Sequence, residues 1–173
     1  MLANLVDILI HEGLTVYKTL GSKASLPKRV EAEELDKDSR KGVIFAVRDK
    51  SHFTSSGVKG YIVTSKESLL ENAHELSHFT PNVFRYGKYV DEHRNFIKGF
   101  TEQNLQQINT FVIDIDTKSV TLQDILMACL EKSIGQPTLI VESPRGYQAY
   151  FVLEEPLFIS NKNNFQVLKI AKR

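Results

Sequence analysis

The segment Thr110–Asp116, which reads TFVIDID, constrains the fold of this chain more than any other segment. Its β-branched and aromatic residues alternate with acids at the end, a pattern that predicts a β-strand. Because side chains alternate across a sheet, Asp114 and Asp116 are expected on one face, together with Val112. Two strand rises place the Cα atoms of the two acids roughly 6.5–7 Å apart.

Two carboxylates at this spacing suggest a metal site. Mg²⁺ and Mn²⁺ prefer such hard oxygen ligands, and an ion held there can orient a triphosphate for displacement at phosphorus. The simpler interpretation is a strand end whose acids face water, and a DxD pair alone does not separate the two interpretations. Asp114 and Asp116 are therefore candidate metal ligands and catalytic residues.

A second group of polar residues lies in a predicted β-hairpin. Its strands are expected at Thr138–Glu142 and at Tyr147–Leu153, where Pro156 ends the second strand. At the turn, Arg145 offers a planar fork for phosphate, and the hydroxyl of Ser143 can hydrogen-bond a phosphate oxygen. Gly146 allows close backbone approach. The alternative is a turn selected for its proline and glycine alone.

Residues 85–98 interleave basic and aromatic side chains. Such a mixture suits the phosphates and bases of a single nucleic-acid strand. The alternative is that the aromatic rings pack inward and the basic residues form ordinary surface. The candidate DNA-binding residues in this segment are Arg85, Tyr86, Lys88 and Arg94.

The remaining elements give a mixed class. Helices are expected before Gly13, after a cap at Thr64, and from Thr121 to Gly135, where Ile125, Leu126, Cys129 and Leu130 form an apolar stripe. Strands are expected at Gly42–Val47 and Gly60–Val63, an exposed loop at 18–41, and a last helix at 161–173. Helices and strands in this order predict an α+β or α/β fold, of which we expect α+β, with helices packed on a mostly antiparallel or mixed sheet.

Length and composition narrow the remaining possibilities. The 173 residues predict one compact domain, and no apolar run is long enough to span a bilayer. With Cys129 as the single cysteine, no internal disulfide is possible, so a reducing cytoplasm is the expected location; Cys129 itself is expected to be buried rather than a nucleophile. A net charge of +1 neither indicates nor excludes a nucleic-acid ligand.

Three strings of residues resemble a known family. They are Phe79–Gly87 (FTPNVFRYG), Asn104–Asp116 (NLQQINTFVIDID) and Gly146–Glu154 (GYQAYFVLE). In this order they resemble the replication-initiation (Rep) proteins of broad-host-range theta-replicating plasmids of Gram-positive bacteria. The match runs over most of the chain and is weakest in the loop at 18–41.

The resemblance implies more than the residues alone do. It implies the N-terminal part of a Rep protein, with an archaeo-eukaryotic primase-polymerase-like sheet that is incomplete at its C-terminus. It implies plasmid origin DNA or single-stranded DNA, nucleoside triphosphate and host replication proteins as partners, no membrane, and Mg²⁺ or Mn²⁺ as cofactor. Asp114 and Asp116 match the family's acidic motif, and a third acid would lie beyond Arg173.

The family's nucleotide-holding hairpin is matched by Ser143, Gly146 and Gln148. With Arg145, these are the candidate nucleotide-binding residues. Gln148 stands where the family has a histidine, and glutamine hydrogen-bonds but carries no positive charge. Whether the chain is an enzyme therefore stays open at this point. The alternatives are a non-catalytic module that binds DNA or a partner, and a truncated remnant without activity.

Overall fold

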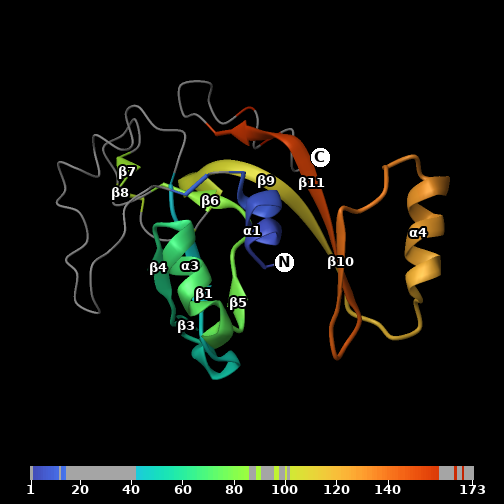
Figure 1. Ribbon diagram of the computed structural model, residues 1–173, viewed down its shortest axis with the longest axis horizontal. Helices are drawn as coiled ribbons and strands as arrows, with labels where there is room; N and C mark the ends of the chain where they lie inside the picture. Colours follow the sequence, from blue (N-terminus) through green and yellow to red (C-terminus); the bar gives the residue numbers. More distant parts are fainter. Residues whose placement is uncertain are drawn as a thin grey trace. The chain divides into compact units, whose positions relative to one another are not determined.

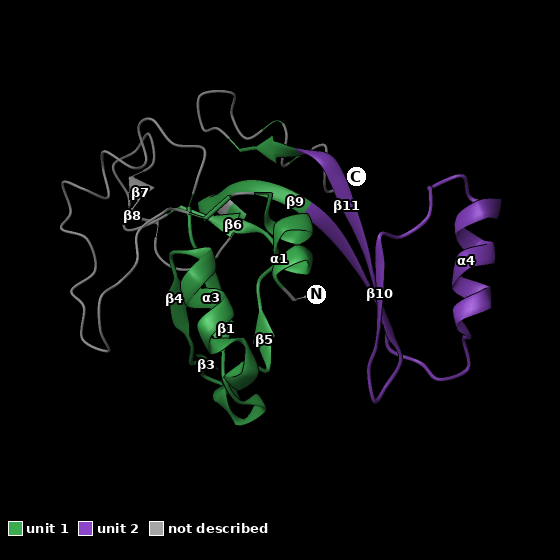
Figure 2. Ribbon diagram, in the orientation of Figure 1, with its two compact units in different colours: residues 1–109, 156–173 green, residues 110–155 purple. Residues whose placement is uncertain are grey.

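The computed structural model of the chain describes residues 2–11, 13–14, 42–85, 89–90, 96–97, 100, 102–159, 166 and 169 (Figure 1). These residues form helices and antiparallel strands, so the predicted α+β class is confirmed. The chain divides into two compact units, unit 1 at 1–109 and 156–173 and unit 2 at 110–155 (Figure 2). The prediction that the whole chain is one domain stays a prediction.

Unit 1 contains a three-stranded antiparallel sheet in the order β4-β1-β5. The central strand β1 (Ile44–Val47) pairs with β4 (Tyr61–Val63) and with β5 (His78–Phe79). The connection from β1 to β4 holds a short 3-10 helix, η1 (Lys50–His52), and a hairpin of β2 (Phe53–Thr54) and β3 (Gly57–Val58). The two predicted strands in this region are thus confirmed, with an additional hairpin between them.

Two helices complete the core of unit 1. The N-terminal helix α1 (Leu2–Ile10) is confirmed, and α3 (Lys66–Asn72) continues into the 3-10 helix η2 (Ala73–Glu75). The expected cap at Thr64 is wrong by one residue, because Thr64 is buried at the end of β4 and the Ser65 hydroxyl accepts from the Ser68 backbone N–H instead. The buried apolar side chains of these helices and strands are Val6, Leu9, Ile10, Ile44, Ala46, Val47, Val63 and Leu69.

In unit 1 the first half of β9 (Leu105–Ile115) pairs with β6 (Val83–Phe84). The strands β7 (Tyr89–Val90) and β8 (Phe96–Ile97) pair with each other, and η3 (Glu102–Asn104) leads into β9. The predicted loop at 18–41 lies outside the described residues. So does most of the predicted last helix, of which Gln166 and Lys169 are described as helical and exposed.

Unit 2 consists of the second half of β9, a helix and a hairpin. The hairpin strands are β10 (Leu139–Glu142) and β11 (Tyr147–Phe158), and β11 lies between β10 and β9. The predicted hairpin is therefore confirmed, but the expected end at Pro156 is wrong. Among the described residues the pairing of β11 with β10 stops at Tyr150, so Pro156 lies where one edge of the strand carries no ladder, a position that tolerates proline.

The helix of unit 2, α4 (Leu122–Glu131), begins with a complete capping box. The Thr121 hydroxyl accepts from the Asp124 N–H at 3.2 Å, and the Asp124 carboxylate accepts from the Thr121 N–H at 2.8 Å. The Thr121 hydroxyl also donates to the Asp124 carboxylate at 2.7 Å, and this bond, followed by the one from the Thr121 N–H, lowers the pKa of Asp124. Ile125 and Cys129 are buried as predicted, whereas Leu130 is 63% exposed and does not belong to the buried stripe.

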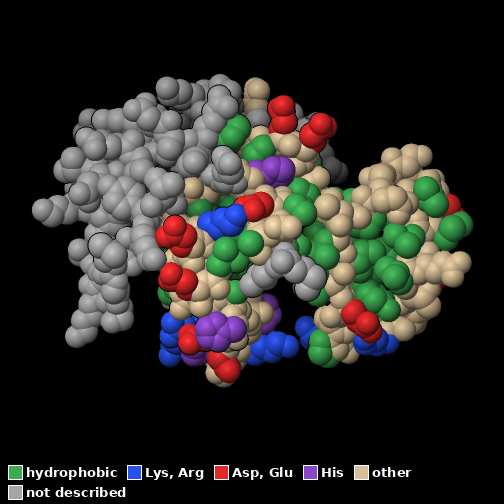
Figure 3. All heavy atoms as spheres, in the orientation of Figure 1, with side chains coloured by type: hydrophobic (Ala, Val, Ile, Leu, Met, Phe, Trp, Pro, Cys, Tyr) green, Lys and Arg blue, Asp and Glu red, His purple; other side chains and the backbone are tan. Residues whose placement is uncertain are grey.

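Unit 2 exposes much of its apolar surface, which Figure 3 shows as a broad green area. In β9, three consecutive apolar residues that alternate between the two faces of the strand are 36–45% exposed: Phe111, Val112 and Ile113. Within the described parts of the chain, no helix combines the length and the apolar character needed to cross a bilayer.

The capping box predicts the effect of a single substitution. Thr121→Ala removes the acceptor for the Asp124 N–H and should lower the free energy of unfolding by about 1 kcal/mol, measured by urea denaturation. Thr121→Ser keeps the hydroxyl and is the control. Equal stabilities for the Ala and Ser variants would show that the cap contributes nothing.

Candidate functional site

The two acids of the TFVIDID segment lie at the end of β9. Asp114 is in the strand and Asp116 follows its last residue, Ile115. Both acids are exposed, whereas Leu105–Thr110 of the same strand are buried. The strand therefore leaves the core of unit 1 before it presents its carboxylates in unit 2.

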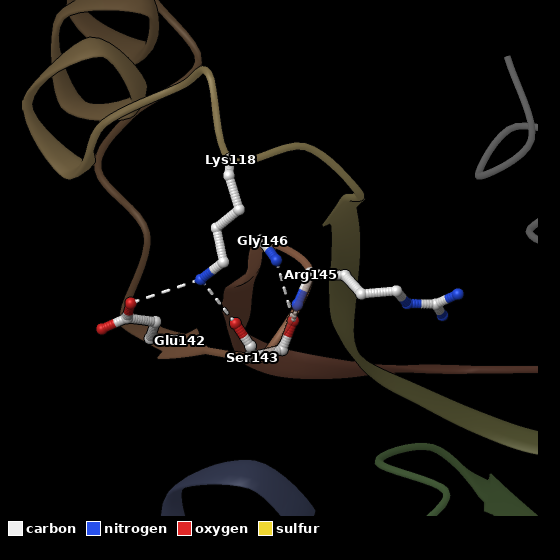
Figure 4. Close-up of polar contacts among 5 residues, drawn as sticks. All are labelled: Lys118, Glu142, Ser143, Arg145 and Gly146. Atoms are coloured by element: carbon white, nitrogen blue, oxygen red, sulfur yellow. Dashed lines mark hydrogen bonds and ion pairs between the residues drawn. The ribbon is translucent and has the colours of Figure 1, made fainter.

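The turn between β10 and β11 is held by its own serine. The Ser143 hydroxyl accepts from the backbone N–H groups of Arg145 and Gly146, at 3.3 and 3.1 Å. The Ser143 N–H donates to the Gly146 carbonyl at 2.8 Å. These bonds fix the four residues that connect the two strands, so the Arg145 side chain leaves from a defined backbone (Figure 4).

Gly146 lies directly against the end of β9. A Cβ atom added to this glycine would be 1.8 Å from the Ile115 carbonyl oxygen and 2.9 Å from the Thr117 nitrogen. Both neighbours are backbone atoms, which cannot rotate away as a side chain can. Glycine is required here by the close approach of two backbones, and this approach brings the hairpin turn to the acid-bearing strand.

Two side-chain contacts join the predicted motifs. The Gln148 side-chain amide donates to Asp114 Oδ1 at 3.4 Å, and Arg145 Nε lies 3.2 Å from Asp116 Oδ1. These two contacts place the acids next to the hairpin turn. The ion pair is weak, because its side chains are 81% and 54% exposed, and exposed pairs contribute roughly 0–1 kcal/mol.

Lys118 is a site residue that the sequence analysis missed. Its ammonium donates to the Ser143 carbonyl at 2.8 Å and to the Glu142 carboxylate at 3.4 Å. It also lies 5.8 Å from the centre of the Tyr147 ring. Figure 4 shows Lys118 reaching the turn, while Arg145 extends away from it. Two basic side chains thus lie at the turn, and one of them, Arg145, pairs with Asp116.

Tyr150 is the second residue that was missed. Its hydroxyl donates to the Gln148 side-chain oxygen at 3.1 Å, so Tyr150, Gln148 and Asp114 form a chain of hydrogen bonds. Burial raises the pKa of Tyr150, and the negative charge of Asp114 raises it further. The phenol therefore stays a proton donor and orients Gln148 with its amide toward Asp114. Alternation along the strand, which places residues 148 and 150 on one face, is the signal that would have found it.

Other predicted residues lie elsewhere. Arg85 is buried in unit 1, where its guanidinium donates to the Ile159 carbonyl at 2.6 Å. This position favours a structural role for Arg85, and its predicted contact with DNA stays a prediction. Tyr86, Lys88 and Arg94 lie outside the described residues. In the described part of the chain, no cluster of three or more His, Cys, Asp or Glu side chains is arranged to hold a metal ion.

Comparison with known proteins points to replication initiation. The chain is 39% identical over 175 residues to a protein named Replication initiation protein from Bacillus anthracis, an alignment that covers 97% of this chain and 34% of that protein. It is 41% identical over 171 residues to Protein RepS of Streptococcus pyogenes and to Protein RepR of Streptococcus agalactiae, covering 96% of this chain and 33% of each.

The chain spans about a third of the length of the curated relatives it matches. No family model matches the chain, and no solved structure matches it. The similarity therefore connects this chain to one part of a protein named for replication initiation and to one part of RepS and RepR. Its fold rests on the strands and helices described above.

The position of Gly146 predicts a large effect from the smallest possible side chain. Gly146→Ala should force the turn away from β9 and destabilise unit 2 by about 1–3 kcal/mol or more, since the clash is with backbone. Urea denaturation and the amide NMR shifts of residues 114–117 measure this. Pro144→Ala, in the same turn, is the control. A Gly146→Ala variant with unchanged stability and shifts would contradict the described contact.

The chain of hydrogen bonds predicts a pKa change across the site. Asp114→Asn should lower the pKa of Tyr150, which stays above its ordinary value because burial is the larger cause. Asp116→Asn is the control and should leave this pKa unchanged. Titration of the tyrosine ring carbons by NMR, with Tyr150→Phe for assignment, measures the change. An identical Tyr150 pKa in the wild type and Asp114→Asn would show that the charge of Asp114 does not act on the phenol.

Proposed function

We propose that this chain is part of a plasmid replication-initiation protein that acts on origin or single-stranded DNA, and that unit 2 is its site for a nucleoside triphosphate with Mg²⁺ or Mn²⁺. The observation that carries the proposal is the contact of the Gly146 turn with the strand of Asp114 and Asp116. Support for the biological setting comes from relatives at 39–41% identity, one named Replication initiation protein and two named RepS and RepR. Host replication proteins and a cytoplasmic location belong to the same proposal.

The residues of unit 2 fit a metal ion that arrives with phosphates. Asp114 and Asp116 would supply carboxylate oxygens, but two carboxylates fill only part of the octahedral shell that Mg²⁺ demands. Phosphate oxygens and water would supply the rest. Once bound, such an ion neutralises phosphate charge and orients the triphosphate.

The basic residues of the site have matching roles. The guanidinium of Arg145 offers a planar fork for phosphate oxygens, and its pair with Asp116 is exposed enough to exchange easily. Lys118 stays on the turn through the Ser143 carbonyl, where its charge is near an incoming phosphate. In this proposal the triphosphate would bind the Arg145 guanidinium in place of Asp116. The Asp116 carboxylate could then coordinate the ion.

We also propose a primase-polymerase-like fold for this chain, because its acidic strand and its hairpin resemble those of that family. A second candidate function is nucleotide or DNA binding without catalysis. Gln148 favours it, because glutamine supplies no positive charge where the family has histidine. Nucleotide incorporation on a single-stranded template with Mg²⁺ or Mn²⁺ separates the two, since only the polymerase extends a primer.

Metal binding tests the site directly. Mn²⁺ titration followed by electron paramagnetic resonance should show weak binding alone and at least about tenfold tighter binding with a non-hydrolysable triphosphate, because phosphate oxygens complete the shell. The Asp114→Asn/Asp116→Asn double variant should lose this enhancement, and Arg145→Gln should weaken the triphosphate.

The matched control is Glu154→Gln/Glu155→Gln, which removes two exposed acids from β11 of the same unit. It should bind Mn²⁺ and triphosphate as the wild type does. Tight binding that is equal in the wild type and in the Asp114/Asp116 double variant would place the metal site elsewhere and overturn the proposal.

A further inference from the structure

The β2–β3 hairpin of unit 1 presents a basic surface with an exposed aromatic ring. From Lys50 to Lys66 the sequence contains no Asp or Glu. Lys50 and Lys59, on either side of the hairpin, are exposed. Figure 3 shows Lys, Arg and His side chains gathered at this end of unit 1, with acidic side chains among them. The hairpin strands themselves contain no charged residue.

Phe53 and Val58 face each other across this hairpin and contribute little to the core. They form a cross-strand pair, and they are 48% and 46% exposed. The Phe53 ring is oriented by His78 of β5, which it meets edge to face with centroids 4.9 Å apart. An exposed aromatic ring that is held in one orientation beside lysines is suited to stacking on a nucleic-acid base. It is less suited to packing in the protein core.

The acids near the hairpin are engaged elsewhere. Asp49 accepts from the Ser51 N–H at 2.7 Å as the cap of η1, and this hydrogen bond lowers the pKa of Asp49. Glu75 pairs with Arg48 at 3.4 Å, and the Arg48 guanidinium lies 5.2 Å from the centre of the Tyr61 ring. Arg48 thus offsets the charge of Glu75, whereas Asp49 keeps its charge, and a phosphate at the hairpin would be attracted by Lys50 and Lys59.

We propose that the β2–β3 hairpin is a contact site for single-stranded DNA, with a base stacked on Phe53 and phosphates neutralised by Lys50 and Lys59. The inference rests on the proposed function, which supplies DNA as the ligand. A single strand fits better than a duplex because its bases are free to stack on a side chain. Two lysines also give too few phosphate contacts for strong electrostatic binding to a duplex.

Fluorescence anisotropy with a labelled oligothymidylate of about 16 nucleotides tests the hairpin in the full chain. Phe53→Ala should weaken binding about tenfold, within the range expected for loss of one stacked base. Phe53→Tyr should retain binding. Val58→Ala is the matched control, because it removes an equally exposed apolar side chain from the same hairpin but no aromatic ring.

The lysines are tested by the salt dependence of the same measurement. Lys50→Gln/Lys59→Gln should reduce the slope of log affinity against log salt by about 1.4, since each phosphate contact on a single strand contributes about 0.7. Circular dichroism and thermal melting check that each variant is folded, and this surface hairpin should tolerate all of these changes.

The outcomes separate this inference from the proposed function. If the wild type binds the oligonucleotide and both the Phe53→Ala and the double-lysine variants bind equally well, the hairpin is not the contact site, and the proposed function is untouched. Should the wild type bind neither single strand nor duplex, DNA binding by this chain fails, and the hairpin inference fails with it. Equal effects of Phe53→Ala and Val58→Ala would also overturn stacking on Phe53.

Discussion

The close approach of Gly146 to the end of β9 is the contact on which the arrangement of unit 2 depends. It joins the hairpin turn to the strand that carries Asp114 and Asp116 through backbone atoms alone. The side-chain contacts between the same segments are a 3.4 Å hydrogen bond and an exposed ion pair. Interactions of that kind contribute about 1 kcal/mol or less, so they report the arrangement and do not cause it.

This division of roles suits a site that must exchange partners. The backbone fixes where the acids and the turn lie, while the ion pair between Arg145 and Asp116 stays open to competition by a phosphate or a metal ion. The chain from Tyr150 through Gln148 to Asp114 is the more constrained part, because burial keeps the phenol protonated and the phenol orients the amide. Gln148 thus has a defined role, since it accepts from the Tyr150 hydroxyl and donates to Asp114.

Much of unit 2 was predictable because its signals are local. Alternation in TFVIDID and the chemistry of the turn at Pro144–Gly146 gave the strand, the hairpin and their candidate residues. The sequence pattern did not predict that β9 begins at Leu105, because the first part of the strand contains polar residues that are nevertheless buried: Gln106, Gln107 and Asn109. The Asn109 side-chain amide donates to the Ile10 carbonyl at 3.2 Å, a partner distant in sequence, while its side-chain oxygen has no hydrogen-bond partner among the described residues.

Other features depended on tertiary contacts that no local pattern carries. Arg85 reads as a surface residue, yet it is buried because the Ile159 carbonyl accepts from its guanidinium. Lys118 belongs to no sequence motif. It becomes a site residue only because the folded turn brings the Ser143 carbonyl within hydrogen-bond distance of its ammonium. The metal, the triphosphate and the DNA partner are inferences from chemistry and resemblance.

The most direct measurement of the central claim is an NMR experiment on the labelled chain. If the Gly146 turn lies against β9, nuclear Overhauser effects should connect the Gly146 α protons with the Thr117 amide proton. The turn's own effects between Ser143 and Gly146 serve as an internal reference, because they depend on local hydrogen bonds. Local effects without any effect between Gly146 and Thr117 would show an intact turn that does not reach the acidic strand, and would contradict the account.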